Sequence, residues 1–233
     1  MPDRTEELQV GLERTRDRIA KACSAAGRDP SEVTLIVVTK TWPADDVRRL
    51  ASLGVRDVGE NRDQEAAPKA AATDDLGLTW HFIGQLQTNK AASVARYAGL
   101  VHSVDRPALA SALDKAAAKA GRRVDCLVQV SLDPDDAEGR GGVPLDRVGE
   151  MADLVASSPH LRLRGVMGVA PLGGDPAAAF ARLAEARRTV CRAYPDANVM
   201  SAGMSDDLEE AVAAGATHLR VGSAILGTRL PRG

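Results

Sequence analysis

The chain has 233 residues, of which 44% are hydrophobic, and this is enough for one substantial core. Its 30 Lys and Arg residues nearly balance its 32 Asp and Glu residues, so no overall basic field would attract nucleic acid or an anionic membrane surface. The charged N-terminus has no apolar signal region, and no later apolar run approaches the roughly 20 residues that a membrane span needs. We therefore expect a cytoplasmic protein that makes no contact with membranes and binds a small molecule.

The first expected elements are a helix and a strand. Residues 5–27 are expected to form an amphipathic helix, because their apolar residues are spaced to share one face and Gly27 can end it. Residues 33–40 form a short apolar run that is rich in β-branched side chains, which is typical of a strand covered on both faces. After this run, strand-like and helix-like segments alternate. The further expected strands are 55–59, 79–83, 100–104, 124–130, 161–169, 198–200 and 218–221, with helices beginning near Pro43, Asn89, Pro107, Pro144, Pro176 and Asp206.

Eight strands separated by helices require parallel pairing through right-handed crossovers. In a chain of this length they close most economically into an α/β fold of the (β/α)8 TIM-barrel class, a single domain over residues 1–233 with an extra N-terminal helix. An open doubly wound sheet is the main alternative. It is disfavoured because residues 41–43, Thr-Trp-Pro, follow the first strand where a dinucleotide-binding sheet would have a glycine-rich turn.

Lys40 ends the first apolar run, whereas the other lysines lie in polar or helix-like segments. A lysine at the end of such a strand can point into a dry, concave site, where desolvation lowers its pKa by disfavouring the ammonium form. The neutral amine can then condense with an aldehyde or ketone. The alternative is that the side chain extends from the strand end into water. Lys40 is therefore a candidate for covalent chemistry in a desolvated site.

In a parallel barrel the functional site lies at the C-terminal ends of the strands. Two neighbouring turns there are rich in glycine and serine, residues 201–205 after the seventh strand and residues 222–223 after the eighth. Backbone N–H groups in such turns can hold a phosphate, and glycine allows the phosphate to approach closely. The alternative is that these residues only form tight turns. The phosphate is expected near Ser201, Gly203, Gly222 and Ser223.

Arg220 lies two residues before Gly222, so strand alternation places both residues on the same face. The guanidinium either faces a ligand or pairs with an acid on a neighbouring strand. A lysine amine, a phosphate-binding turn and an arginine are the groups needed to hold pyridoxal 5'-phosphate. The aldehyde, phosphate and ring nitrogen of this cofactor lie at different corners of the molecule.

Six segments carry a family resemblance, and they occur in the family's order along essentially the whole chain. Together they closely resemble the pyridoxal phosphate homeostasis proteins, which are similar in fold to the N-terminal barrel of alanine racemase. The resemblance implies that Lys40 is the reactive Schiff-base lysine and that Arg220 lies beside the ring nitrogen. It further implies Ser201, Gly203, Gly222 and Ser223 around the phosphate, with Asn61 as another cofactor-binding residue. The segments are VTKT at 38–41, VGEN at 58–61, WHFIGQLQTNK at 80–90, LRGVMG at 163–168, SAGMSDDL at 201–208 and LRVGSAILG at 219–227.

The chain departs modestly from the family's pattern at three positions. Thr39 stands where serine is common, Gln85 replaces a usual proline, and Ser223 replaces a usual threonine. Ser223 keeps a hydroxyl group, so its assignment to the phosphate is retained. Residues 133–142 are acidic and glycine-rich, which is typical of a solvated loop, and we assign them no role. Three widely spaced cysteines without a Cys/His cluster predict neither a disulfide framework nor a metal site.

The resemblance and the residue types favour holding the cofactor over turning it over. Arginine stays protonated, so donation from Arg220 would leave the ring nitrogen unprotonated and weaken the cofactor as an electron sink. Tyr97 and Tyr194 fall in helix-like segments, and His81 between two aromatic residues is more typical of a core residue than of a base. We therefore expect a carrier without efficient turnover that acts in intracellular vitamin B6 homeostasis, as a monomer or weak dimer, with pyridoxal-phosphate-dependent apoenzymes as candidate partners. The alternatives are an amino-acid racemase that uses the same lysine and a cofactor-free Schiff-base lyase.

Overall fold

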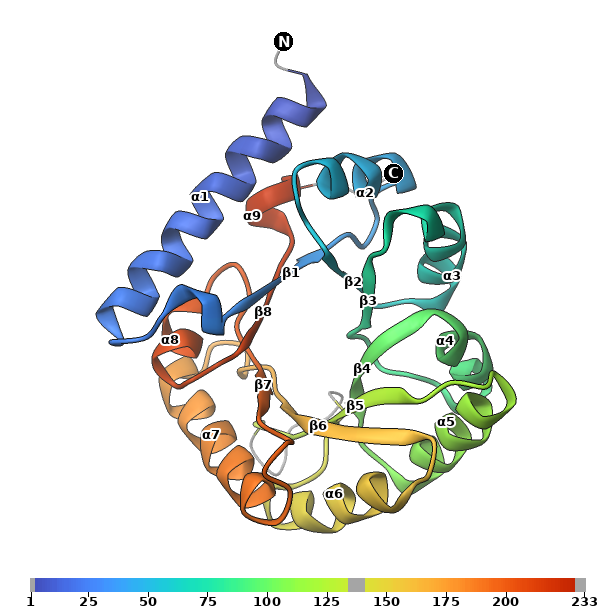
Figure 1. Cartoon of the computed structure of the whole chain (residues 1–233). Coiled ribbons are helices and arrows are strands. Elements are labelled where there is room, and N and C mark those ends of the chain that lie inside the picture. Colours follow the sequence, from blue (N-terminus) through green and yellow to red (C-terminus); the bar gives the residue numbers. More distant parts are fainter. Residues whose placement is uncertain (1–2, 134–140, 229–233) are drawn as a thin grey trace.

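The structure, a computed structural model, describes residues 3–133 and 141–228. Its centre is a closed barrel in which eight parallel strands pair in chain order and β8 pairs with β1 (Figure 1). The predicted (β/α)8 barrel is therefore confirmed. The strands are β1 (Thr34–Val38), β2 (Asp57–Glu60), β3 (Thr79–Phe82), β4 (Ala98–Val104), β5 (Val124–Gln129), β6 (Leu161–Met167), β7 (Val199–Ser201) and β8 (His218–Val221).

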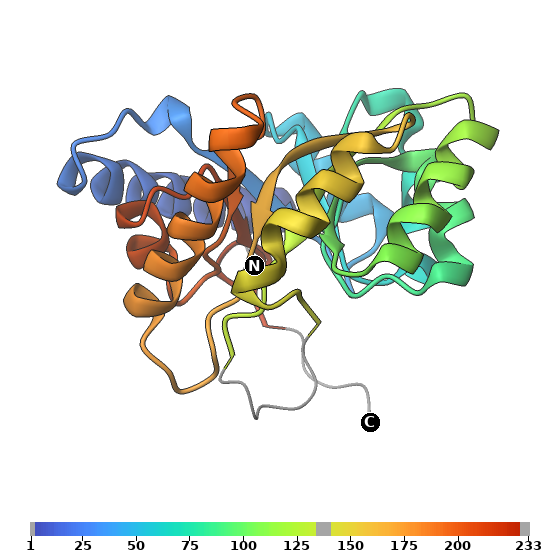
Figure 2. The ribbon, with the colours of Figure 1, turned by 90° about the horizontal axis from the view of Figure 1, so that it is seen from below.

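Helices surround the barrel and cover the outer face of its sheet (Figures 1 and 2). Several begin where the sequence provides a start signal, such as the proline at the first position of α5 and the Asp175 side chain that accepts a hydrogen bond from Ala177 N at the start of α7. The helices of the described residues are α1 (Arg4–Ala25), α2 (Ala44–Ser52), α3 (Asp63–Ala72), α4 (Ala91–Tyr97), α5 (Pro107–Lys119), α6 (Val148–Ser157), α7 (Pro176–Ala193), α8 (Leu208–Ala213) and α9 (Ser223–Leu226).

The predicted N-terminal helix is α1, which lies outside the repeating strand–helix pattern and packs on α8 and α9 (Figure 1). Leu8 and Leu12 are buried on its inner face. Arg18 adds a two-point ion pair with Glu209 of α8, in which Nε and Nη2 donate over 2.9 and 2.8 Å. These contacts fix α1 against the last part of the chain, next to the strand pair β8 and β1.

The apolar core has two parts. The larger one lies between the outer face of the barrel and the helices, as expected when a sheet is covered by a layer of helices. The smaller one fills part of the barrel interior and is built from Leu100, Leu127, Met167 and Val199 of four successive strands, β4 to β7. The remainder of the interior contains polar side chains, which are described below.

The second strand begins later than the expected range of 55–59. Val55 belongs to the end of α2, because its N–H donates to Leu50 O over 3.0 Å and Gly54 adopts a left-handed conformation with φ of 85°. Residues 134–140, which form most of the segment interpreted as a solvated loop, lie outside the described residues. Among the described residues, none of the helices combines the length and the apolar character that crossing a bilayer requires.

Candidate functional site

Lys40 lies at the C-terminal end of the barrel, two residues beyond the end of β1, and it is exposed to solvent. The expectation that its amine is desolvated in a dry cavity is therefore wrong. The physical reason is that β1 ends at Val38, so Lys40 belongs to the turn above the barrel and not to the covered part of the strand. Val38 O lies 3.0 Å from the position that a Cβ on Gly222 would occupy, so the turn with Lys40 begins beside the glycine turn after β8.

Arg220 is 5% exposed inside the barrel, on the strand that pairs with β1. Its Nη1 donates to Ser201 Oγ over 2.6 Å, and its Nη2 donates to Gly168 O over 3.0 Å. Burial lowers the pKa of Arg220 to about 10, while the charge of Asp207 acts in the opposite direction, and the group stays protonated at neutral pH. Among the described residues no carboxylate forms an ion pair with this guanidinium, so of the two interpretations of Arg220 the inter-strand salt bridge is not formed.

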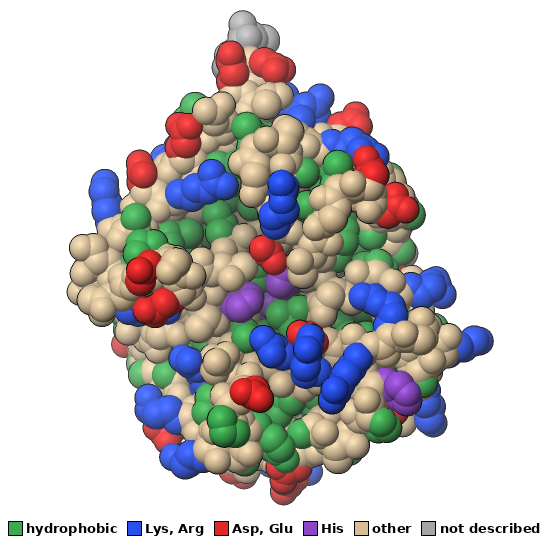
Figure 3. Space-filling model, in the orientation of Figure 1, with side chains coloured by type: hydrophobic (Ala, Val, Ile, Leu, Met, Phe, Trp, Pro, Cys, Tyr) green, Lys and Arg blue, Asp and Glu red, His purple; other side chains and the backbone are tan. Residues whose placement is uncertain are grey.

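A chain of hydrogen bonds runs from Arg220 across the barrel interior. Ser201 Oγ lies 2.9 Å from His102 Nδ1, His102 Nε2 lies 2.9 Å from His81 Nδ1, and His81 Nε2 lies 3.0 Å from Asp57 Oδ1. Histidine atoms reach the surface at the centre of the face in Figure 3, and Asp57 begins β2. The chain of hydrogen bonds therefore extends from the N-terminal mouth of the barrel, where the strands begin, to the buried Arg220.

The direction of this chain follows from counting protons. Ser201 Oγ accepts from Arg220, so its single proton is donated to His102 Nδ1. His102 then carries its proton on Nε2 and donates to His81 Nδ1, and His81 donates from Nε2 to Asp57. Burial lowers the pKa of His102 well below 6.5, which is consistent with a neutral ring. Every donor in the chain thus points away from Arg220.

We expect both His81 and His102 to be neutral and to carry the proton on Nε2 at neutral pH. Two-dimensional nitrogen NMR of the histidine rings in the cofactor-free protein measures this directly, because the chain has only four histidines. In a Ser201→Ala variant, His102 Nδ1 loses its donor, and its nitrogen shift is expected to move while that of the distant His160 stays unchanged. An Nδ1-protonated tautomer of His102 in the unaltered chain would contradict this assignment.

The two glycine and serine turns meet at the C-terminal end of the barrel. Ser223 Oγ donates to Ser205 Oγ over 3.1 Å, so hydroxyl groups from both turns lie side by side. Gly203 has a φ of 90°, and a Cβ there would lie 2.6 Å from Ala211 Cβ, so this position requires glycine for packing alone. Sequence reasoning did not select Ser205, although it stands in the same turn as Ser201. The Ser201 hydroxyl is fully buried and already bonded on both sides, and the Ser201 carbonyl accepts from Gly168 N over 3.1 Å.

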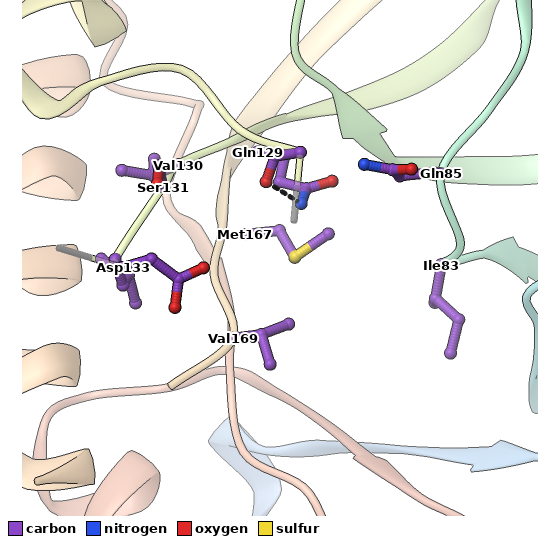
Figure 4. Close-up of a pocket in the computed structure, with 10 residues that line it drawn as sticks. Ile83, Gln85, Gln129, Val130, Ser131, Asp133, Met167 and Val169 are labelled. Atoms are coloured by element: carbon purple, nitrogen blue, oxygen red, sulfur yellow. Dashed lines mark hydrogen bonds between the residues drawn. The ribbon is translucent and has the colours of Figure 1, made fainter. Parts of the chain in front are cut away.

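Asn61 follows β2 at the rim of the barrel and lines an open polar cavity with Gln85, Gln87 and Lys90. The structure does not bring its side chain into a hydrogen bond with the other predicted site residues. A separate cavity of about 140 Å³ lies among the ends of β3, β5 and β6, and Figure 4 shows Ile83 and Gln85 on one side of it with Met167 and Val169 on the other. None of the predicted cofactor-binding residues lines this second cavity.

Lys69 is the buried lysine near the site, and sequence reasoning missed it. It lies on α3 and is 9% exposed, and its Nζ donates to Glu60 Oε1 over 2.6 Å and to Thr39 O over 2.9 Å. The Glu60 carboxylate is also buried. This burial raises the pKa of Glu60, and the bond from Lys69 partly offsets the effect. Both members of the ion pair therefore form hydrogen bonds with Thr39, the residue that precedes Lys40.

Comparison with known proteins places this geometry in a family. The sequence pattern of the alanine racemase N-terminal domain matches residues 10–230. A pyridoxal phosphate homeostasis protein of Mycobacterium bovis is 44% identical over 98% of this chain and 95% of its own length. The chain belongs to the pyridoxal phosphate homeostasis protein family. The Escherichia coli member is 37% identical, over 96% of this chain and 97% of its own.

Solved structures agree with this family assignment. PipY of Synechococcus elongatus, determined with pyridoxal phosphate bound, is 38% identical and has a TM-score of 0.77 over 90% of this chain and all of its own. A protein of unknown function from Bifidobacterium adolescentis superposes with a TM-score of 0.89 at 29% identity, over 97% of both chains. Alanine racemase of Corynebacterium glutamicum, at 14% identity and a TM-score of 0.67, shares the fold.

Proposed function

We propose that this chain binds pyridoxal 5'-phosphate at the C-terminal mouth of the barrel, holds it as a Schiff base on Lys40, and acts in intracellular vitamin B6 homeostasis without efficient turnover. The main support is Arg220, a buried guanidinium that has no ion pair with a described carboxylate and lies on the strand next to β1. A buried charge is retained when something satisfies it, and a ligand at the mouth of the barrel can do so. The PipY structure, which holds the cofactor in a barrel of the same family, supports this interpretation.

For each part of the cofactor we propose a protein group that binds it. When bound, pyridoxal phosphate supplies an aldehyde that condenses with a primary amine and releases water. Arg220 uses two of its five N–H groups within the protein, so further donors are available for the ring nitrogen. Around the phosphate we propose the Ser223 hydroxyl and the backbone of Gly222, Gly203 and Ser201. Asn61 is proposed as a contact at the rim.

Two features support holding over turnover. The tyrosine hydroxyls are engaged elsewhere, since Tyr97 donates to Asp63 over 3.3 Å and Tyr194 donates to Asp153 over 2.8 Å. Burial raises the pKa of Tyr97 far above 10, so its hydroxyl stays protonated at neutral pH and does not accept a proton from a substrate. Lys40 is exposed, and water near the reacting carbon would weaken electrostatic stabilisation of a carbanion. Free pyridoxal-phosphate-dependent apoenzymes are the proposed recipients of the stored cofactor.

Reductive trapping tests the proposal. The protein is incubated with pyridoxal phosphate and reduced with borohydride, and its peptides are mapped by mass spectrometry. We expect one pyridoxyl adduct, on Lys40, and its loss in Lys40→Ala, with Lys21→Ala as the exposed control that leaves it unchanged. An adduct on another lysine would contradict the site, and no adduct would contradict the function. Turnover of single-enantiomer alanine or serine that disappears in Lys40→Ala would establish the racemase instead.

A further inference from the structure

The backbone on the N-terminal side of Lys40 is fixed by Thr39, which is fully buried. Its N–H donates to Gly59 O over 3.0 Å, and its Oγ1 donates to Glu60 Oε1 over 2.8 Å. Lys69, on α3 at the outer face of the sheet, reaches the same carboxylate. The side chain of Thr39 is therefore held on the helix side of the barrel. Lys40 follows this fixed residue directly, in the turn above the mouth of the barrel.

A second set of contacts fixes the backbone on the C-terminal side. Thr41 N donates to Glu65 Oε2 over 2.8 Å, and Trp42 N donates to Thr39 O over 3.1 Å. Thr41 has a φ of 70°. Among the described residues, no other non-glycine residue has a positive φ. This conformation is unfavourable for a β-branched residue, so the surrounding bonds must hold it in place.

Both sets of contacts converge on three charged side chains of β2 and α3. Lys69 Nζ donates to Thr39 O and to Glu60 Oε1, and it lies 3.7 Å from Glu65 Oε2. Glu60 and Glu65 in turn accept from the residues on either side of Lys40. The group is buried at Glu60 and Lys69 and does not touch the predicted phosphate turns, so binding an anion does not account for it.

We propose that Glu60, Glu65 and Lys69 form a clamp that positions Lys40 over the mouth of the barrel, and that the strained Thr41 is held by this clamp. The inference rests on the proposed function, because the proposed function supplies the aldehyde with which Lys40 reacts. The three residues are positioning residues, because the contacts that connect them to residues 39–41 are to the Thr39 hydroxyl, the Thr39 carbonyl and the Thr41 N–H. A misplacement of about 1 Å at a reacting group can lower a rate up to about a hundredfold, so such a device affects reaction rate strongly.

Two matched pairs of variants test the clamp. Thr39→Val removes the hydroxyl donor to Glu60 while keeping the shape, and Thr39→Ser keeps the donor. Glu65→Ala removes the acceptor for Thr41 N, and Glu65→Gln keeps an oxygen there. The first readout is amide hydrogen exchange of the peptide covering residues 39–42 in the cofactor-free protein. The second is the rate of the borohydride-trapped adduct on Lys40 with pyridoxal phosphate, divided by the rate with pyridoxal, which has no phosphate to orient it.

Thr39→Val and Glu65→Ala are expected to speed exchange in the 39–42 peptide and to lower the rate ratio about tenfold. Thr39→Ser and Glu65→Gln are expected to stay within about twofold of the unaltered chain. If Thr39→Val fails to fold, the partly exposed Glu65 pair decides the matter. Unchanged exchange in Glu65→Ala, or faster exchange with an unchanged ratio, overturns the clamp alone. Absence of any adduct in the unaltered chain overturns the proposed function and the positioning role with it.

Discussion

Replacing Lys69 by methionine is expected to lower the free energy of unfolding by about 3–5 kcal/mol, because it leaves the buried carboxylate of Glu60 without its cation. Oε1 of Glu60 now accepts from both Lys69 and Thr39, and Oε2 is buried with no hydrogen-bond partner among the described residues. Lys69 is thus the cation that balances the charge of the Glu60 carboxylate. Urea unfolding followed by circular dichroism measures the change, with the slope of the transition checked for two-state behaviour.

Two further variants separate charge from packing at this site. In the double variant Glu60→Gln with Lys69→Met, the residual acceptor still meets Thr39 and no buried charge is left, so we expect most of the lost stability to return. Lys21→Met changes an exposed lysine of α1 and is expected to shift stability by less than about 0.5 kcal/mol. If Lys69→Met were as stable as Lys21→Met, the ion pair would contribute nothing and the description of Glu60 would be wrong.

Stability is also expected to fall as the pH drops from about 6.5 toward 4, because the buried His102 and the partly buried His218 remain neutral in the folded chain. Burial lowers the pKa of His218 from 6.5 to about 4, and burial lowers the pKa of His102 well below 6.5. Below pH 6.5 the unfolded chain binds protons that the folded chain does not, so each histidine removes about 1.4 kcal/mol per pH unit until its folded pKa is reached. Glu60 acts in the opposite direction, since burial raises its pKa.

Chemical unfolding at a series of pH values between 7 and 4 measures this loss. His218→Asn keeps a polar partner for Thr217 and removes one titrating ring, so its stability is expected to fall less steeply with pH. His160→Asn is the matched control, because the His160 side chain is 43% exposed and its removal is expected to leave the slope nearly unchanged. A pH dependence in His218→Asn equal to that of the unaltered chain would contradict the lowered pKa of His218.

The barrel could be predicted from sequence because its signals are local. Short β-branched runs alternate with helix starts at proline and aspartate, and this order leaves few topologies. The start of β2 was misplaced because Val55 is apolar and β-branched like a strand residue, yet it closes the end of α2. The helix α3 gave little signal, since it is rich in alanine and carries Pro68 inside it. Its position, and therefore that of Lys69, was found only in the structure.

The site was less predictable because its main contacts join distant parts of the chain. His102 and Ser201 are 99 residues apart, and neither shows in sequence that its side chain meets the other. Arg220 could be placed inside the barrel from strand alternation, whereas the absence of an ion pair with any described carboxylate depends on every neighbouring strand. The exposure of Lys40 depends on where β1 ends and on the loops around it, which the apolar run does not determine.

Because Lys40 is exposed to solvent, a small aldehyde can reach it and leave it by diffusion without any opening of the barrel. Under the proposed function, loading and unloading would follow the lifetime of one carbon–nitrogen double bond and the supply of competing amines in the surroundings. A store built this way responds to demand as quickly as that bond exchanges, whereas a sealed active site must wait for a lid to move.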